Sequence, residues 1–509
     1  MTRLAVVALA GLSAIVLLAA MVVASSAFSL ATERQVAYEY LDEAILSPER
    51  LQPIVDWQPA TTALARDVTA VEHEVVGRAM TEAWSAYTAA QHLGQTAMLA
   101  DYFSGVALER AQQAAHTAHK TGTRMVVLSI SAEPVFYHLD GSVLQVRAQS
   151  LTARYAKAED GALAQFRLTH DTTLTTLMNE SSGWRVFSHE RQDVRPVAAR
   201  TTPHIDKINQ LAGINYYPAD TPWRAFWANF DTEVIAQDFG RIRDLGANSI
   251  RVFLPRDVFL EETGKESALV NLQILLDLAA EFDLSVVPTL FDLRPGYDLT
   301  GWPDDLRYLQ GVLPVLKGHR AVAFVDLKNE PDLDFAPHGR ARVEAWLRTM
   351  IALHHEMAPE LALTIGWASH VDALTLADQL DVLSYHDYAA VDQSAARLKA
   401  IRGKADGKPV MITEIGESSY SALGDWPGSP RMQAVRLQDR LAAMAQSDGV
   451  FIWTLNDFPD PDAEAVGHSL WVRNLQSSFG LFDPAGRPKP AAKTVATFFE
   501  TFLKGARIE

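Results

Sequence analysis

Short apolar runs alternate with amphipathic stretches from Leu211 onward, and this alternation limits the fold more than any other feature of the chain. The runs have the length and the β-branched content of strands, whereas the stretches between them space their apolar residues three and four apart, as helices do. Eight such units in about 300 residues predict an α/β fold, the (β/α)8 TIM barrel, whose active residues gather at the carboxyl ends of its strands. The predicted strands are Leu211 to Tyr216, Ser249 to Phe253, Ser285 to Leu290, Val322 to Leu327, Leu361 to Gly366, Val382 to Tyr385, Val410 to Thr413 and Val450 to Trp453. The predicted helices include Glu233 to Leu245, Leu269 to Phe282, Asp304 to Lys317, Arg340 to Met357 and Met432 to Gln446.

The chain before the barrel has a different pattern and predicts a separate α+β domain. Residues Ala31 to about Ala118 are rich in alanine and helical in their spacing. A run of strands follows, with turns at Asp140-Gly141, Asp160-Gly161 and Ser182-Gly183. We therefore expect an accessory domain over residues 31–193, a polar and proline-containing linker over 194–210, and the barrel over 211–509. The predicted strands of the accessory domain are Met125 to Ile130, Val135 to Tyr137, Val143 to Tyr155, Phe166 to Leu177 and Trp184 to His189.

The segment over residues 1–30 contains an uncharged apolar stretch from Leu4 to Ala24. About 20 apolar residues are enough to cross a bilayer as a helix, whereas the apolar part of a cleavable signal is usually shorter. We expect a transmembrane anchor that places the rest of the chain in the periplasm or at the cell exterior, since Arg3 favours the inner side. The alternative is secretion after cleavage near the small residues Ala24-Ser-Ser-Ala27.

Composition narrows the possible partners. The formal net charge is −17, which argues against a nucleic-acid partner because phosphate binding requires clustered Lys and Arg. The chain has no cysteine, so disulfides, thiolate metal sites and a cysteine nucleophile are excluded. The sequence shows no metal-ligand cluster and no phosphate-binding glycine loop, and we expect neither a metal nor a cofactor. The motifs of metalloproteases and α/β-hydrolases are missing as well.

Two glutamates stand at corresponding points of the predicted barrel. Glu330 follows the fourth predicted strand in Leu327-Lys-Asn-Glu-Pro331, and Glu414 follows the seventh in Ile412-Thr-Glu-Ile-Gly416. Cleavage of a glycosidic bond requires such a pair, one carboxyl to protonate the departing oxygen and one to attack the sugar. The spacing therefore indicates chemistry on sugars.

These motifs, in this order, resemble those of glycoside hydrolase clan A, with families 5 and 2 the nearest. The resemblance extends from about Leu211 to Leu503 and rests on the Asn329-Glu330 pair, on Glu414 and on further residues at strand ends. Those further residues are Arg251, the His386-x-Tyr388 motif, Trp453 and the closing stretch Phe479-Gly-Leu-Phe-Asp-Pro-Ala-Gly-Arg-Pro-Lys-Pro490. One departure follows the third strand, where Phe291-Asp-Leu-Arg-Pro-Gly296 lacks the histidine that many family 5 members use to contact the sugar.

The resemblance implies roles for the matched residues. Glu330 would be the general acid and base, with a pKa raised by its neighbour, and Glu414 the nucleophile that forms a covalent glycosyl intermediate. Asn329 would bind the sugar 2-hydroxyl, and Arg251 would keep Glu414 ionised and oriented. Tyr388 would donate its hydroxyl to Glu414, and His386 would contact the sugar.

Other residues near strand ends are weaker candidates. Trp453 offers a flat apolar surface on which a pyranose could stack, and Asn215 and Tyr216 could line the cleft from the first strand. Three further aromatic residues could line subsites, and four charged residues could bind hydroxyls, although capping of loops is the simpler reading of each charged residue. The aromatic residues are Trp223, Tyr217 and Trp302, and the charged residues are Asp292, Arg294, Asp387 and Asp457.

Together these observations predict a retaining glycosidase acting on a β-linked glycan or an exported polysaccharide. A transglycosylase remains open as an alternative, because hydrolysis and transfer share the same covalent intermediate. A non-catalytic glycan-binding protein of the cell envelope is the alternative from another class. The expected partner is an oligo- or polysaccharide, together with the membrane through residues 1–30.

The accessory domain resembles the cone-shaped folds related to nuclear transport factor 2. Its order of helices and strands carries this resemblance, together with the stretch Gln95 to Gln113, which contains Asp-Tyr-Phe-Ser-Gly. The simplest expectation is a spacer or a surface for a protein partner, without chemistry of its own.

Overall fold

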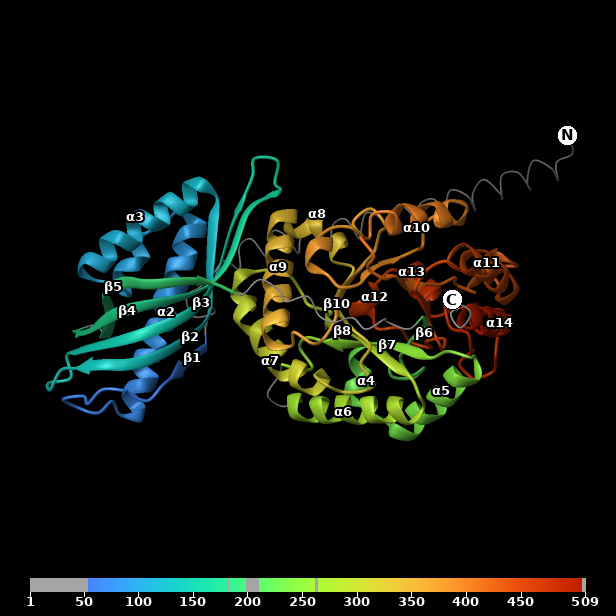
Figure 1. Cartoon of the computed structure of the whole chain (residues 1–509), viewed down its shortest axis with the longest axis horizontal. Coiled ribbons are helices and arrows are strands. Elements are labelled where there is room, and N and C mark those ends of the chain that lie inside the picture. Colours follow the sequence, from blue (N-terminus) through green and yellow to red (C-terminus); the bar gives the residue numbers. More distant parts are fainter. Residues whose placement is uncertain (1–53, 182, 198–209, 261–263, 506–509) are drawn as a thin grey trace, which may run out of the picture.

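The computed structural model describes residues 54–181, 183–197, 210–260 and 264–505, which form an N-terminal α+β domain and a barrel (Figure 1). The predicted anchor over residues 1–30 and most of the predicted linker lie outside this range. Within it, no helix is both long enough and apolar enough to cross a membrane.

The N-terminal domain is a five-stranded sheet in the order β1-β2-β3-β4-β5, with β1 parallel to β2 and the other neighbours antiparallel. Two long helices cover one of its faces (Figure 1). Helix α2 begins with a capping box, in which Thr69 and Glu72 satisfy each other's backbone N–H groups. The elements are β1 Ile54–Trp57, α2 Ala70–Leu93, η2 Ala97–Asp101, α3 Gly105–Thr121, β2 Thr123–Tyr137, β3 Val143–Lys157, β4 Leu163–Glu180 and β5 Gly183–Pro196.

Two of the predictions for this domain were wrong. Strand β1 lies inside the stretch predicted to be helical, because Ile54–Trp57 pairs with Ser129 to Ala132 of β2, a distant contact that local spacing does not reveal. The two short strands predicted before Val143 form the single strand β2. Pro134 lies next to an irregularity in the pairing with β3, which interrupts the ladder without ending the strand.

Part of the sheet is buried on both faces, where alternating side chains belong to two different cores. Met125 and Val127 of β2 pack with α2 and α3, whereas Val126 and Leu128 join the apolar cluster of the barrel. Tyr155 of β3 stacks on Trp302 of the barrel with ring centroids 6.2 Å apart and an interplanar angle of 13°. The accessory domain is therefore packed against the barrel, on the side formed by α7 and α9.

Eight parallel strands close the barrel in the order β6-β7-β8-β9-β10-β11-β12-β15, and β15 pairs with β6, as the sequence predicted. The strands are β6 Leu211–Asn215, β7 Ser249–Pro255, β8 Ser285–Asp292, β9 Val325–Asn329, β10 Leu363–Trp367, β11 Leu383–His386, β12 Val410–Ile415 and β15 Gly449–Trp453. The larger helices outside them are α5 Thr232–Asp244, α6 Lys265–Glu281, α7 Trp302–Leu316, α9 Arg340–Met357, α10 Ser394–Arg402, α11 Pro430–Ala443 and α14 Pro490–Gly505. Smaller elements in the loops are α4 Arg224–Ala228, η3 Leu299–Gly301, η4 Pro331–Asp334, α8 Phe335–His338, η5 Ala377–Gln379, η6 Val391–Gln393, β13 Ser421–Leu423, β14 Trp426–Pro427, α12 Ala463–Val466 and α13 Leu470–Gln476.

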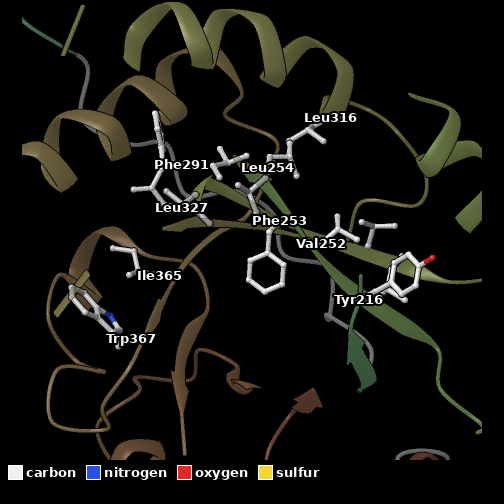
Figure 2. Packing of buried hydrophobic residues seen from close by; sticks show 14 of the residues in the cluster. Tyr216, Val252, Phe253, Leu254, Phe291, Leu316, Leu327, Ile365 and Trp367 are labelled. Carbon is white, nitrogen blue, oxygen red and sulfur yellow. The ribbon is translucent and has the colours of Figure 1, made fainter. Parts of the chain in front are cut away.

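The barrel strands are buried on both faces, which explains why they are nearly continuous apolar runs. Figure 2 shows neighbouring strands contributing to one cluster, with Phe253 from β7, Phe291 from β8 and Leu327 from β9. Polar side chains interrupt these runs where β6, β8, β9 and β12 approach their carboxyl ends, and β7 carries Arg251 nearer its start. The carboxyl ends of the strands therefore form the polar end of the barrel.

Candidate active site

Glu330 and Glu414 converge at the carboxyl ends of β9 and β12. One carboxylate oxygen of each, together with a ring nitrogen of His386, lie within 4.8 Å of one another. Glu414 is 9% exposed and Glu330 is partly buried. Glu330 adopts a left-handed conformation with φ 49°, and its N–H donates to the carbonyl of Gly366 at 2.7 Å. A non-glycine residue in this region costs about 1–2 kcal/mol, and such strain concentrates at functional sites.

Arg251, on β7, is hydrogen-bonded both to Glu414 and to Asn329, the residue before Glu330. Its guanidinium is fully buried and donates to Glu414 Oε2 at 3.2 Å through Nη1 and to Asn329 Oδ1 at 2.7 Å through Nη2. It also donates twice to Asp326 Oδ2, at 2.7 and 3.1 Å. Each hydrogen bond comes from a rigid, planar group, so Arg251 fixes the orientation of Glu414 relative to Asn329.

Asn215 lies behind this group and does not reach a cleft. Its side chain is fully buried, with Oδ1 accepting from Arg251 at 2.9 Å and Nδ2 donating to the carbonyl of Thr413 at 3.1 Å. Both polar atoms are therefore used inside the protein, and the expectation that Asn215 binds substrate was wrong. Tyr216 is also fully buried, with its hydroxyl donating to Asp238.

His386 and Tyr388 contact one glutamate each. The Nδ1 atom of His386 lies 2.7 Å from Glu330 Oε1 and 3.9 Å from Glu414 Oε2. The Tyr388 hydroxyl donates to Glu414 Oε1 at 2.8 Å, so both oxygens of Glu414 accept a hydrogen bond. The contact predicted between Tyr388 and Glu414 is thus present in the structure.

The pKa of Glu330 is lowered and that of Glu414 is raised, whereas the sequence predicted a raised pKa for Glu330. Burial raises the pKa of Glu330, but the hydrogen bond and charge of His386, with Arg251 and Lys328, bring it below its ordinary value. Burial, joined by the negative charge of Glu330, raises the pKa of Glu414 even though His386 and Arg251 oppose this. The expected raised pKa of Glu330 is therefore not found, because His386 lies against this carboxylate, a contact that the sequence did not predict.

The charge of the His386 ring lowers the pKa of both Glu330 and Glu414, so its protonation state matters for the pair. Burial lowers the pKa of His386, and the negative charges of Glu414 and Glu330 raise it above its ordinary value. The Nε2 atom of the ring is buried and has no hydrogen-bond partner among the described residues. A charged ring would leave an unpaired N–H there, which is costly. A neutral ring with its proton on Nδ1 avoids that unpaired N–H, although Nε2 remains an unpaired acceptor within the described part of the chain, and it removes the charge that lowers the pKa of Glu330.

The aromatic candidates form two groups. Trp453, Trp223 and Tyr217 pack together, whereas Trp302 packs against the accessory domain. Trp453 is 7% exposed and packs edge-on against Phe253, while its Nε1 donates to Gln476 Oε1 at 3.3 Å. Trp223 and Tyr217 pack with Trp453, and the Tyr217 hydroxyl donates to Asp292 at 3.3 Å. Trp302 is fully buried against Tyr155 of the accessory domain, so the prediction that it lines a subsite was wrong.

Three of the four charged candidates are structural. Arg294 binds Asp305 through Nη2 at 2.7 Å, and Asp387 accepts from Arg397 at 2.9 Å. Asp457 accepts from Lys489 at 2.7 Å and from the N–H of Gly480 at 2.8 Å. These contacts agree with the simpler reading of loop capping. Asp292 is buried and hydrogen-bonded to Tyr217, and its pKa is raised by burial.

Two residues of the site were missed from the sequence. Asp326 is fully buried, binds Arg251 and accepts from the N–H of Gly366 at 2.8 Å. Lys328 is 7% exposed, and its positive charge acts on both Asp292 and Glu330. Charged residues inside the apolar run of β9 were the available signal, because a charge in a buried strand requires a partner.

The donor atoms of Glu330, His386 and Glu414 are also close enough together to bind a cation. Positive charge is already supplied at this place by Arg251, 3.2 Å from Glu414, and by Lys328 near Glu330. A further cation would be repelled by both, so the arrangement fits a carboxylate pair better than a metal centre.

Comparisons with known proteins give likenesses of fold. No family model matches the chain, and no curated protein matches it. Among solved structures, the exo-β-1,4-mannosidase Op5Man5 from Opitutaceae bacterium strain TAV5 is 21% identical with a TM-score of 0.48, covering 58% of this chain and 60% of that one. The chain thus spans less than two thirds of the length of the mannosidase.

Two further structures are similar to comparable extents. A GH5_18 protein from Streptomyces cattleya in complex with GlcNAc is 20% identical with a TM-score of 0.48, covering 61% of this chain and 82% of that one. A β-glucuronidase from Ruminococcus gnavus in complex with D-glucuronic acid is 15% identical with a TM-score of 0.44, covering 74% of this chain and 68% of that one.

Proposed function

We propose that the barrel is a retaining β-glycosidase, with Glu330 as acid and base and Glu414 as nucleophile, acting on a β-linked glycan or an exported polysaccharide. The observation that supports this most is the approach of the two carboxylates, with one oxygen of each within 4.8 Å. Retaining enzymes hold their carboxyl groups about 5–5.5 Å apart, whereas inverting enzymes separate them by about 6.5–9.5 Å to admit a water.

In the first step, Glu414 attacks the anomeric carbon while Glu330 protonates the departing oxygen. Attack requires an ionised Glu414. Arg251 at 3.2 Å and the Tyr388 hydroxyl at 2.8 Å both stabilise its charge and direct its oxygens. Since each oxygen accepts one of these bonds, the carboxylate is held in one orientation before the sugar arrives.

Protonation of the leaving group requires a protonated Glu330. With His386 neutral, its Nδ1–H still donates to Glu330 Oε1 at 2.7 Å, which leaves Oε2 to carry the proton toward the glycosidic oxygen. Burial and the negative charge of Glu414 then both favour the protonated form of Glu330. Once Glu414 is glycosylated its charge is gone, the pKa of Glu330 falls, and Glu330 acts as the base that activates water.

Leaving-group dependence tests these roles. A substrate with a very acidic leaving group, such as a 2,4-dinitrophenyl β-glycoside, needs little protonation. Glu330→Ala should therefore lose much more activity on an alkyl β-glycoside than on the dinitrophenyl compound, while Glu414→Ala should lose activity on both. Equal losses on the two substrates in Glu330→Ala would contradict the assignment.

Transfer in place of hydrolysis is the second outcome that the same site allows, since a sugar hydroxyl can take the place of water in the second step. Product analysis at high acceptor concentration separates the two.

We also propose a fold for the accessory domain and a membrane anchor in residues 1–30. The two helices followed by an antiparallel meander support kinship of the accessory domain with the folds related to nuclear transport factor 2. The apolar stretch Leu4 to Ala24 supports a membrane anchor with the barrel outside the cytoplasm. Fractionation of cells, followed by detection of the chain in the membrane pellet, tests the anchor.

A further inference from the structure

The accessory domain contains a cavity of about 310 Å³ between α2, α3 and the sheet. All of its lining residues lie between Trp84 and Arg191, so none comes from the barrel. Its volume is at the lower end of the range for small-molecule sites. The exposed residues Arg110, Ala114 and Arg191 mark its opening to the surface.

Small side chains on both walls create this space. Helix α3 presents Ala107, Ala111 and Ala118 to the cavity, and the facing strands present short residues such as Ser150 and Thr152. Protein interiors are normally filled to the density of organic crystals, and larger side chains at these positions would close the gap. A domain that served only as a spacer would have no need for this hollow.

The walls carry an excess of positive charge in a chain whose net charge is −17. Arg154 and Arg191 both point at Asp171 Oδ2, at 2.6 and 3.9 Å, and Arg110 adds a third guanidinium. Asp171 is the one acidic residue that lines the cavity. Three guanidinium groups and one carboxylate therefore line the cavity, and a second anion would improve this balance of charge.

The apolar and uncharged polar parts of the wall suit a ring. Trp84 lies at the cavity with its ring in edge contact with Phe103 and with His189, at centroid distances of 6.1 and 4.6 Å. Burial lowers the pKa of His189 to about 4, so this residue adds no charge near neutral pH. Gln91 is 3% exposed, and its Oε1 has no hydrogen-bond partner among the described residues. A buried acceptor left unpaired in a lined cavity indicates a missing donor.

We propose that this cavity binds a small molecule consisting of a carboxylate on a six-membered ring, with the carboxylate between Arg154 and Arg191 and the ring against Trp84. A ligand hydroxyl would donate to Gln91 Oε1. Two sources share this chemistry, a uronic acid sugar and an aromatic acid. The site is separate from the glycosidase site, and the proposal does not depend on the activity of the barrel.

Isothermal titration calorimetry on the full chain tests the proposal with two matched pairs of probes. D-glucuronate is compared with D-glucose, and 4-hydroxybenzoate with 4-hydroxybenzyl alcohol. We expect one of the two acids to bind while its neutral counterpart does not, and the acid that binds identifies the source. Arg191→Gln should weaken binding roughly tenfold or more, because it removes a charge-assisted hydrogen bond.

A second variant blocks the cavity, and two control variants carry matched changes elsewhere. Ala114→Phe places a ring at the opening and should abolish binding, whereas Gln113→Phe on the neighbouring exposed position of α3 should not. Arg167→Gln removes an exposed arginine of β4 that does not line the cavity and should leave the affinity unchanged.

The proposal is overturned if neither acid binds at millimolar concentration, or if Ala114→Phe binds as well as the unmodified chain. The barrel is an alternative place for D-glucuronate to bind, and Glu414→Gln distinguishes the two sites. Binding that survives Glu414→Gln and is lost in Ala114→Phe belongs to the accessory domain, and the reverse pattern places it in the barrel and contradicts the proposal.

Discussion

Asn329 is held by Arg251, whose Nη2 donates to its Oδ1 at 2.7 Å. This bond fixes the amide so that its NH2 group is left to donate elsewhere. Under the proposed function, that donor binds the 2-hydroxyl of the sugar, where the contact strengthens as positive charge develops on the ring.

Asn329→Ala should therefore lower kcat/KM by about 100- to 1000-fold on a substrate with a 2-hydroxyl, the usual effect of removing one donor that acts in the transition state. The loss should be much smaller on the matching 2-deoxy substrate. A comparison of kcat/KM for the two substrates in both proteins measures this difference, and equal losses would show that Asn329 acts only through Arg251.

Arg251 should also be critical for stability. Arg251→Met leaves Asp326 buried without its partner, and breaking a buried ion pair costs about 3–5 kcal/mol. The free energy of unfolding, measured in urea, should fall by that amount. The double variant Arg251→Met with Asp326→Asn serves as the control and should lose less than the sum of the two single variants. Additive losses would mean that the pair is not coupled.

His386 should influence the pH dependence of activity. Its Nδ1–H bond lowers the pKa of Glu330 whether the ring is neutral or charged, and a charged ring lowers it further, so His386→Leu, which removes both, should raise that pKa. Glu330 must be protonated in the first step, and a higher pKa keeps it protonated to higher pH. The basic limb of the profile of kcat/KM against pH should therefore move upward. A basic limb that stays in place or moves downward would exclude this control by His386.

The contact between the two domains should contribute to the stability of the whole chain. Tyr155 is 7% exposed and stacks on Trp302, which is fully buried. Tyr155→Ala should lower the free energy of unfolding by about 3–5 kcal/mol, as for other large buried aromatic residues. Phe136→Ala, at a position that is 45% exposed on the same sheet, is the control and should cost far less. Equal effects would mean that the domains are not packed together in solution.

The sequence predicted the barrel well because each strand is buried on both faces and so appears as an apolar run. The predicted ends of the barrel strands differ from the observed ends by at most three residues. Strand β9 begins at Val325 and not at Val322, because Val322 makes an isolated bridge to Val286 before the regular strand starts. Strand β1 was missed for another reason, since its pairing with β2 joins residues far apart in the chain.

The residue types of the site could be predicted, together with the contacts of Arg251 and Tyr388 with Glu414, but the contact of His386 could not. Glu330, Glu414, Arg251, His386 and Tyr388 meet as their motifs indicated. The sequence did not reveal that His386 would face Glu330, since a histidine at a strand end can turn toward either glutamate. Asn215 and Trp302 were predicted to contact the substrate, but both side chains are fully buried, and the sequence pattern does not show how deeply a side chain is buried.

The central claim is that Glu414 forms a covalent bond to the sugar. The most direct test is to incubate the chain with a panel of 2-deoxy-2-fluoro β-glycosyl fluorides, which slow the second step, and to identify the modified peptide by mass spectrometry. We predict one glycosyl adduct on Glu414, absent in Glu414→Gln and retained in Glu330→Gln. An adduct on another residue, or none from a panel that includes a sugar the active enzyme cleaves, would contradict the account.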